Sequence, residues 1–117
     1  MTDRDPDCLF CKIVAGEIPS DRVHEDNDVI AFRDIAPRAP THVLVIPRRH
    51  IPDAHALTES DGDLLAKLFT VVRGVADAAG LANGYRVVTN VGPESGQTVF
   101  HLHLHLLGGR PMAWPPG

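Results

Sequence analysis

The sequence lacks several features that would assign it to a specialised class of protein. Its 117 residues include only two cysteines, one tryptophan and one tyrosine, and its net charge is −4. No apolar run approaches the ~18 residues of a membrane-spanning helix, and no block of Lys and Arg suggests binding to a nucleic acid backbone. The N-terminal segment MTDRDPDCLF does not have the charged and then apolar layout of a signal peptide. We therefore expect one cytoplasmic domain over residues 1–117, with no membrane or nucleic acid partner.

The two cysteines stand close together in the sequence. In a reducing compartment, Cys8 and Cys11 are not expected to form a structural disulfide. Their C-x-x-C spacing is half of a metal-binding motif, and a tetrahedral zinc ion would need two further ligands. Two free, buried thiols are the alternative interpretation.

Hydrophobic periodicity predicts an α+β domain with an antiparallel meander sheet. A short helix is expected over residues 9–15. The predicted strands are residues 29–32, 42–46, 85–89 and the segment from Val99 through the histidine-rich stretch.

A long helix is expected to begin at Thr58 or Ser60 and to end at Gly80. Its predicted core stripe is Leu64, Leu68, Val72, Val75 and Ala79. A second apolar set on the same helix is Leu65, Phe69 and Val71. We expect this second set, together with the open edges of a small sheet, to be covered in a homodimer.

The stretch HLHLHLLGG places three histidines at alternate positions, His101, His103 and His105. Side chains alternate between the faces of a strand, so the sequence predicts three imidazoles on one face and three leucines on the other. The alternatives are a half-solvated strand and an adventitious metal trap. The preceding loop, Gly96 to Val99, has the composition to turn amide groups and the Thr98 hydroxyl toward an anion.

Two imidazoles on one strand face lie about 6.6 Å apart, at ~3.3 Å per residue. At an effective dielectric constant of ~20, two protonated rings at that distance repel by about 2.5 kcal/mol, close to two pKa units. We therefore expect a neutral, nucleophilic imidazole beside a cationic, proton-donating one, with a bound phosphate favouring the cation.

The pattern HLHLHLL resembles the signature of the histidine triad (HIT) family. FRDIAPRAPTHVLVIPRRHI, GYRVVTNVG, SGQTVFHLHLHLLGGR and the terminal MAWPPG resemble the Hint branch of that family, the purine nucleoside phosphoramidases. The resemblance implies a HIT-like sheet of about five strands with one long helix and a short N-terminal helix. It also implies a nucleotide hydrolase that cleaves P–N bonds through a covalent nucleotidyl-histidine and releases AMP or GMP.

The resemblance also implies roles for individual residues. His103 would be the nucleophile, His105 would contact the phosphate and assist the leaving group, and His42 would support the catalytic ring. Asp34 would accept hydrogen bonds from the ribose hydroxyls. The base slot would be formed by Phe10, Ile13, Phe32 and Ile35, and the phosphate-facing positions would be Asn90, Gly96, Gln97, Thr98 and Val99.

Bacterial members with the N-terminal cysteine pair imply that His50 and His101 complete a structural zinc site with Cys8 and Cys11, with no metal needed for catalysis. Residues 1–6 are expected to be flexible. Residues 110–117 are expected to lie at the dimer interface near the active site, with Trp114 on the leaving-group side.

Two other functions stay open from the sequence. One is hydrolysis of dinucleoside polyphosphates, and the other is a nucleotide-binding regulatory or scaffold role with vestigial catalysis. The presence of the middle histidine, His103, favours an enzyme.

Overall fold

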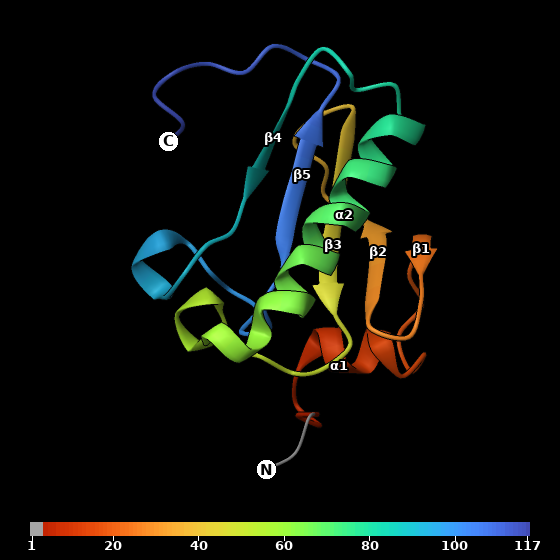
Figure 1. The fold of residues 1–117 in the computed structure, drawn as a ribbon, viewed down its shortest axis with the longest axis vertical. Coiled ribbons are helices and arrows are strands. Elements are labelled where there is room, and N and C mark those ends of the chain that lie inside the picture. Colours follow the sequence, from red (N-terminus) through yellow and green to blue (C-terminus); the bar gives the residue numbers. More distant parts are fainter. Residues whose placement is uncertain (1–3) are drawn as a thin grey trace.

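The computed structural model describes residues 4–117 and confirms the predicted α+β architecture (Figure 1). The elements are, in order, α1 (Leu9–Val14), β1 (Arg22–Glu25), β2 (Val29–Arg33), β3 (Thr41–Pro47), α2 (Gly62–Ala78), β4 (Tyr85–Val88) and β5 (Leu104–Gly108). Three short 3₁₀ turns cover Ala54–Ala56, Glu59–Asp61 and Pro93–Ser95. The strands form one antiparallel sheet in the order β1-β2-β3-β5-β4. Strands β1 to β3 follow one another as in the predicted meander, but β5 rather than β4 lies beside β3.

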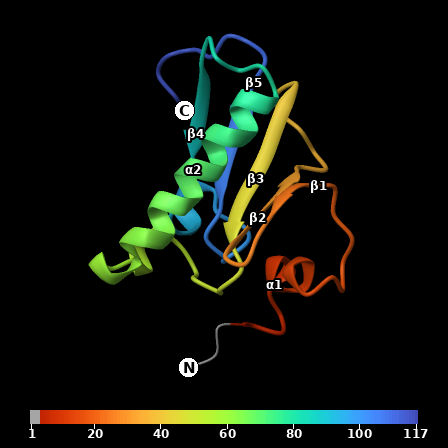
Figure 2. The same cartoon turned by 45° about the vertical axis from the view of Figure 1, so that its right-hand side comes forward.

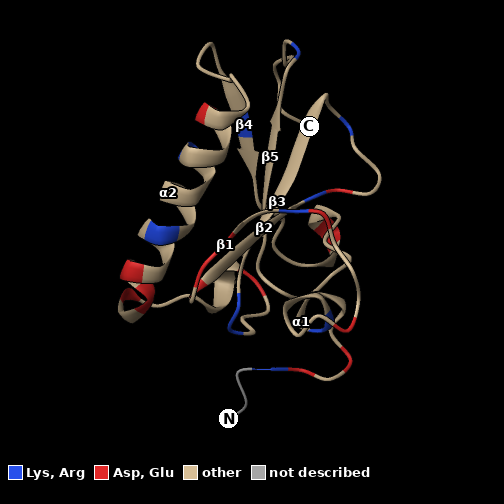
Figure 3. Cartoon of the chain, turned by 90° about the vertical axis from the view of Figure 1, so that its right-hand side faces the viewer, with Lys and Arg blue, Asp and Glu red and all other residues tan. Residues whose placement is uncertain are grey.

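The two helices lie on opposite faces of the sheet (Figures 2 and 3). The reason is visible in β3, where successive side chains point to opposite faces. Val43 and Val45 belong to the larger apolar cluster, which includes the buried face of α2. Leu44 and Ile46 belong to a second cluster, which includes α1. Since α1 has only 6 residues, it covers only part of its face, and the site described below opens beside it.

Helix α2 begins after a 3₁₀ turn, four residues beyond Thr58. The Asp61 carboxylate accepts the Thr58 amide hydrogen over 2.9 Å, so the predicted capping position is used, although the α-helix itself starts at Gly62. The buried residues of α2 are Leu68, Val71, Val72 and Ala76. No helix within residues 4–117 combines the length and the hydropathy needed to cross a membrane.

The predicted stripes of α2 need two corrections. Val71 is a core residue, only 5% exposed, rather than part of the outward apolar set, and Ala79 is exposed beyond the end of the helix while Ala76 takes the core position. Leu65 and Phe69 are exposed as predicted, at 37% and 48%.

The histidine stretch is only partly a strand. Strand β5 starts at Leu104, so His101 and His103 precede it, which corrects the prediction that all three histidines share one strand. The leucines behave as expected, because Leu102, Leu104 and Leu106 are all buried in the cluster under α2. Strand β1, with the sequence RVHE, was not predicted.

Both ends of the chain contact the domain. Of the N-terminal segment predicted to be flexible, residues 1–3 lie outside the described part, and Arg4 pairs with Glu17 over 2.8 Å. In the C-terminal tail, the Arg110 guanidinium donates to the carbonyl of Arg38 at 3.0 and 3.2 Å. The Arg86 guanidinium donates to the carbonyl of Ala113 at 2.7 Å. These contacts hold the tail beside β4 (Figure 1).

Candidate active site and metal centre

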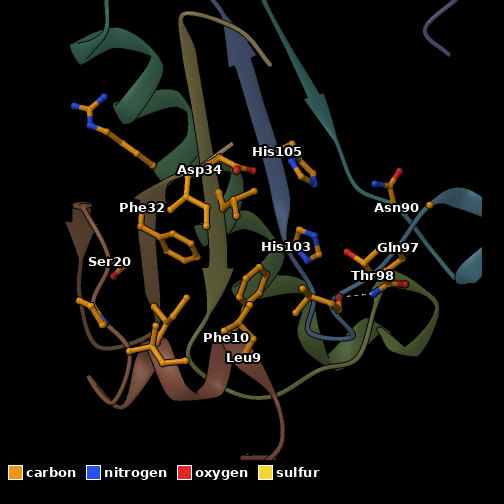
Figure 4. Close-up of a pocket in the computed structure, with 18 residues that line it drawn as sticks. Leu9, Phe10, Ser20, Phe32, Asp34, Asn90, Gln97, Thr98, His103 and His105 are labelled. Carbon is orange, nitrogen blue, oxygen red and sulfur yellow. Dashed lines mark hydrogen bonds between the residues drawn. The ribbon is translucent and has the colours of Figure 1, made fainter. Parts of the chain in front are cut away.

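A pocket of about 350 Å³ opens on the sheet face that α1 partly covers. Figure 4 shows Phe10 and Phe32 on one side of it, Asn90, Gln97 and Thr98 on the other, and His103 and His105 between them. The volume falls in the range of small-ligand sites. Its walls are apolar on the α1 side and polar on the loop side, so the pocket can take a ligand that has a flat apolar part and an anionic part.

His103 presents an unprotonated nitrogen to this pocket. Its Nδ1 lies 2.6 Å from the main-chain carbonyl of His101, and because a carbonyl only accepts, Nδ1 carries the hydrogen. The lone pair of the neutral ring is therefore on Nε2. The Thr89 hydroxyl donates to the carbonyl of His103 over 2.8 Å and fixes the main chain from the other side.

His105 presents the opposite arrangement. The amide of Arg38 donates to Nδ1 of His42 over 3.0 Å, so the hydrogen of the neutral His42 ring lies on Nε2. That hydrogen is donated to Nδ1 of His105 over 2.9 Å. The hydrogen of His105 must then be on Nε2. The pocket therefore holds a lone pair on His103 and a hydrogen-bond donor on His105, with ring centroids 5.0 Å apart.

All three rings favour the neutral form. Burial lowers the pKa of His42 and of His103, and burial together with the neighbouring His103 and His42 lowers the pKa of His105 to about 4. The expectation of one cationic imidazole in the free protein is therefore wrong. Desolvation acts on every ring, whereas the argument from spacing considered only repulsion within the pair.

Asp34 lies in the pocket wall next to this histidine pair. One carboxylate oxygen accepts the Ala36 amide hydrogen over 2.8 Å, and the other lies 3.4 Å from Nε2 of His42. A carboxylate anchored through one oxygen keeps acceptor capacity on the other. Asp34 is thus placed to accept a hydrogen bond from a ligand in the pocket.

The loop before the histidines has a rigid internal structure. The buried Gln97 side chain accepts the Gly92 amide hydrogen over 2.8 Å and donates to the carbonyls of Pro52 and Val99 at 2.9 and 3.1 Å. Gly96 adopts a left-handed conformation, with φ of 95°, that suits glycine. The Gln97 side chain therefore shapes the loop, and Gly96, Gln97, Thr98 and Val99 line the pocket.

Four predicted ligands converge beneath the pocket: Cys8, Cys11, His50 and His101. Zinc bonds of about 2.3 Å to sulfur and about 2.05 Å to nitrogen place tetrahedral S–N ligand pairs about 3.5 Å apart and N–N pairs about 3.3 Å apart. Nδ1 of His101 lies 3.5 Å from each sulfur, Nδ1 of His50 lies 3.3 Å from the Cys11 sulfur, and the two nitrogens are 3.3 Å apart. These distances fit one tetrahedral ion.

The surroundings of the four ligands also suit a metal. Nε2 of His101 donates to the Pro47 carbonyl over 2.8 Å, which leaves Nδ1 as the free ligand atom, and burial lowers the pKa of this ring to about 4. The amides of Cys11 and Asp5 point at the sulfurs of Cys8 and Cys11, both at 3.4 Å. Burial raises the pKa of the Cys8 thiol, so a thiolate there needs a cation beside it. The donor set and its partners therefore fit zinc.

Asp34, His42 and His105 form a second close group of potential ligands. The hydrogen bond from the Arg38 amide excludes this group as a metal site in the arrangement seen, because it requires a hydrogen on Nε2 of His42, the atom that would face the ion. The group is a hydrogen-bond relay.

Several contributors were not predicted from the sequence. Leu9, Ile18, Pro19, Ser20, Arg33 and Leu44 also line the pocket. The Ser20 hydroxyl is buried, and among residues 4–117 it is the single buried side-chain polar atom without a hydrogen-bond partner. The Arg38 amide donates to His42 and the Thr89 hydroxyl donates to the His103 carbonyl, so both affect the pocket through its histidines. No motif marks these three polar groups, because they become neighbours of the pocket only through the loop and strand geometry.

Two of the predicted site residues are largely exposed to solvent. Ile35 lines the pocket but is fully exposed. Trp114 is 84% exposed and is not among the residues that line the pocket within one chain. All other predicted nucleotide-site residues except His42 line it, and His42 contacts it through His105.

Comparisons with known proteins identify the family of this chain. A family model of the HIT domain matches residues 15–112. An uncharacterised HIT-like protein from Synechococcus elongatus is 52% identical over 111 residues, which cover 95% of this chain and 97% of that protein. The crystal structure of a HIT family hydrolase from Legionella pneumophila has a TM-score of 0.93 and 53% identity, covering 95% of this chain and 100% of that one.

A second solved structure, a HIT family hydrolase from Clostridium thermocellum, has a TM-score of 0.91 and 47% identity, covering 93% of this chain and 96% of that one. The region matched by the family model begins after the Cys8–Cys11 pair, so it does not include these two metal-ligand candidates. It does include the pocket histidines and Asp34, and the chain belongs to the HIT domain family.

Proposed function

We propose that the protein is a nucleoside phosphoramidase that hydrolyses the P–N bond of purine nucleoside 5′-phosphoramidates and releases AMP or GMP. The observation that carries the proposal is the pairing of opposite tautomers in one pocket. Nε2 of His103 has a free lone pair, and Nε2 of His105 carries a hydrogen. Family membership and the hydrolase relatives support a hydrolase-type enzyme.

The proposed first step uses the lone pair of His103. It forms a bond to phosphorus while the P–N bond breaks, and the leaving amine takes a proton from solvent. The Nδ1 hydrogen of His103 stays bonded to the His101 carbonyl, which stabilises the charge that develops on the ring. The Nε2 hydrogen of His105 is donated to the phosphate group of the substrate. Water then attacks phosphorus and loses a proton to solvent, while the bond between phosphorus and Nε2 breaks and its electron pair returns to His103.

The rest of the pocket would bind the nucleotide. The ring planes of Phe10 and Phe32 are at 78° with centroids 5.6 Å apart, and together with Ile13 and Ile35 they offer an apolar slot to a purine. The Asp34 carboxylate oxygen that does not accept the Ala36 amide hydrogen would accept from the ribose hydroxyls. Asn90, Gly96, Gln97, Thr98 and Val99 would form the phosphate side of the pocket.

Zinc would have a structural role in this enzyme, held by the two cysteines, His50 and His101. None of these four residues is among those that line the pocket, and no proposed step uses a metal. Metal-bound thiolates must stay reduced, which supports a cytoplasmic location.

We also propose a homodimer with the tail, residues 110–117, close to the partner's active site. Leu65, Phe69 and Tyr85 are large, exposed apolar side chains on α2 and β4, and β4 is an edge strand of the sheet. Trp114 does not line the pocket of its own chain, so a role at the leaving-group side requires a second subunit.

Turnover of a fluorogenic adenosine phosphoramidate tests the function, with a dinucleoside polyphosphate as the competing substrate. Faster cleavage of the phosphoramidate is the expected result. Preference for the polyphosphate would replace the proposal with the alternative hydrolase. Binding of AMP without turnover of either compound would indicate a regulatory protein.

A further inference from the structure

The metal centre and the base slot share one short helix. Cys8 and Cys11 lie on either side of Phe10 in the first turn of α1. The Phe10 ring is 5% exposed and meets the His103 ring edge-on, with a centroid distance of 5.0 Å and an angle of 86°. The residue between the two cysteines therefore touches both the candidate nucleophile and the candidate base slot.

A second link passes through the main chain. The ring of His101 belongs to the metal centre, while its carbonyl accepts the Nδ1 hydrogen of His103 over 2.6 Å. The next amide, of Leu102, donates to the carbonyl of Ile51 over 2.6 Å, and Ile51 directly follows the ligand His50. Ligands from three separate segments thus meet directly beneath His103.

The six residues of α1 are too few to hold a helical position by themselves. Outside the metal centre, the buried side chains of α1 that anchor it are Phe10 and Ile13, and both also line the pocket. If the centre loosens, the apolar wall of the pocket and the contact on His103 have to shift together.

We propose that metal loading of this centre positions the nucleophile and the base slot, with Phe10 as the positioning residue that connects them. This inference rests on the proposed function, because it assigns the pocket to a nucleotide. It predicts that zinc and nucleoside monophosphate bind cooperatively to the same chain. Thermodynamic linkage requires each ligand to tighten the other by the same factor.

The first experiment measures this reciprocity by isothermal titration calorimetry. AMP is titrated into zinc-loaded protein and into protein stripped with a chelator, and zinc affinity is measured against a competing chelator with and without AMP. We expect AMP to bind zinc-loaded protein about tenfold tighter, and AMP to tighten zinc by the same factor. Equal AMP affinities in two folded forms would overturn the inference.

The second experiment keeps the protein zinc-loaded and needs no stripped form. Phe10→Ala is compared with Ile13→Ala. Ile13 lines the same slot on the same helix but does not make the edge-on ring contact with His103 that Phe10 makes. Both variants should keep one zinc and raise KM, but only Phe10→Ala should lower kcat, by about tenfold or more, because the nucleophile loses its support. Without the Phe10 contact the His103 ring should also rotate away from the His101 carbonyl, so that its ¹⁵N spectrum shows mixed tautomers. An unchanged kcat and a single tautomer in Phe10→Ala would overturn the inference, including in the case where stripped protein unfolds.

Failure of the proposed function would look different. In that case zinc-loaded wild-type protein would neither bind AMP nor cleave the phosphoramidate, so the enzyme assay on the wild type separates the two ideas before any variant is made.

Discussion

Nε2 of His42 lies 2.9 Å from Nδ1 of His105, and this contact determines which nitrogen of His105 faces the pocket. His42 can donate there only because its own Nδ1 accepts the Arg38 amide hydrogen over 3.0 Å. A main-chain amide in an exposed loop thus fixes the proton position on a ring two hydrogen bonds away.

Replacing His42 tests this relay. His42→Ala should lower kcat about 10- to 100-fold, since His105 loses the partner that keeps its hydrogen on Nε2. His42→Gln should retain more activity, because an amide side chain can both accept from Arg38 and donate to His105. Steady-state kinetics measures both, with His24→Ala as a control at a half-buried histidine that pairs with Asp26 outside the pocket. Wild-type kcat in His42→Ala would show that the relay has no catalytic role.

The His105 pKa predicts a pH dependence of stability. In the folded chain it is about 4, against an ordinary value of 6.5, because of burial and the neighbouring rings. Between pH 4 and pH 6.5 the ring is protonated in the unfolded chain and neutral in the folded chain. The ring's contribution to stability is therefore complete above about pH 6.5 and falls as the pH drops toward 4.

His105→Asn removes that contribution. Urea unfolding at pH 7 and pH 5 should show a smaller loss of unfolding free energy in this variant than in wild type. His55→Ala, at an exposed histidine outside both sites, should lose as much as wild type. Parallel losses in His105→Asn and wild type would mean that the ring titrates normally in the fold.

Zinc content tests the metal centre. Purified protein should carry one equivalent per chain, and Cys11→Ala should carry much less and melt about 10 °C lower or more, because a structural ion contributes directly to folding. Elemental analysis and calorimetry measure the two effects, again with His55→Ala as the unaffected control. A metal-free wild type that melts at the same temperature with and without chelator would leave the cysteines as buried free thiols.

The exposed pair on α2 tests the dimer. Wild-type protein at micromolar concentration should sediment at twice the chain mass, and Phe69→Glu should shift it toward the monomer by placing a charge in an apolar contact. Thr70→Glu puts the same charge on the next, exposed position of the helix and should stay dimeric. A monomeric wild type would rule out the dimer, and with it any role for Trp114 across an interface.

Parts of the fold that depend on local pattern could be predicted from the sequence. The stripe containing Leu68 and Val72 and the alternating leucines of the histidine stretch are buried as expected. Strand β1 escaped prediction because RVHE has little apolar alternation and gains its place by pairing with β2. The start of β5 was misplaced because HLHLHL alternates before the strand begins, where His101 lies among the candidate metal ligands and outside the sheet.

The candidate site, like the fold, could be predicted from the sequence only in part. The C-x-x-C spacing pointed to a metal, but the other two candidate ligands, His50 and His101, and the role of His42 beside His105 came from the resemblance to the HIT family. The tautomers were not predictable, because they depend on the Arg38 amide and the His101 carbonyl, which every residue of a chain possesses. Neutral rings were missed for a similar reason, since desolvation depends on the depth of burial, which spacing along a strand does not reveal.

The most direct test of the account is the site of covalent modification during turnover. Wild-type protein mixed with an adenosine phosphoramidate and quenched in milliseconds at mildly alkaline pH should carry one adenylyl group on His103, seen by intact mass and peptide mapping. His103→Ala should carry none and lose turnover, yet still bind AMP. Rapid product release by His103→Ala, or an adenylyl group on any other residue, would contradict the account.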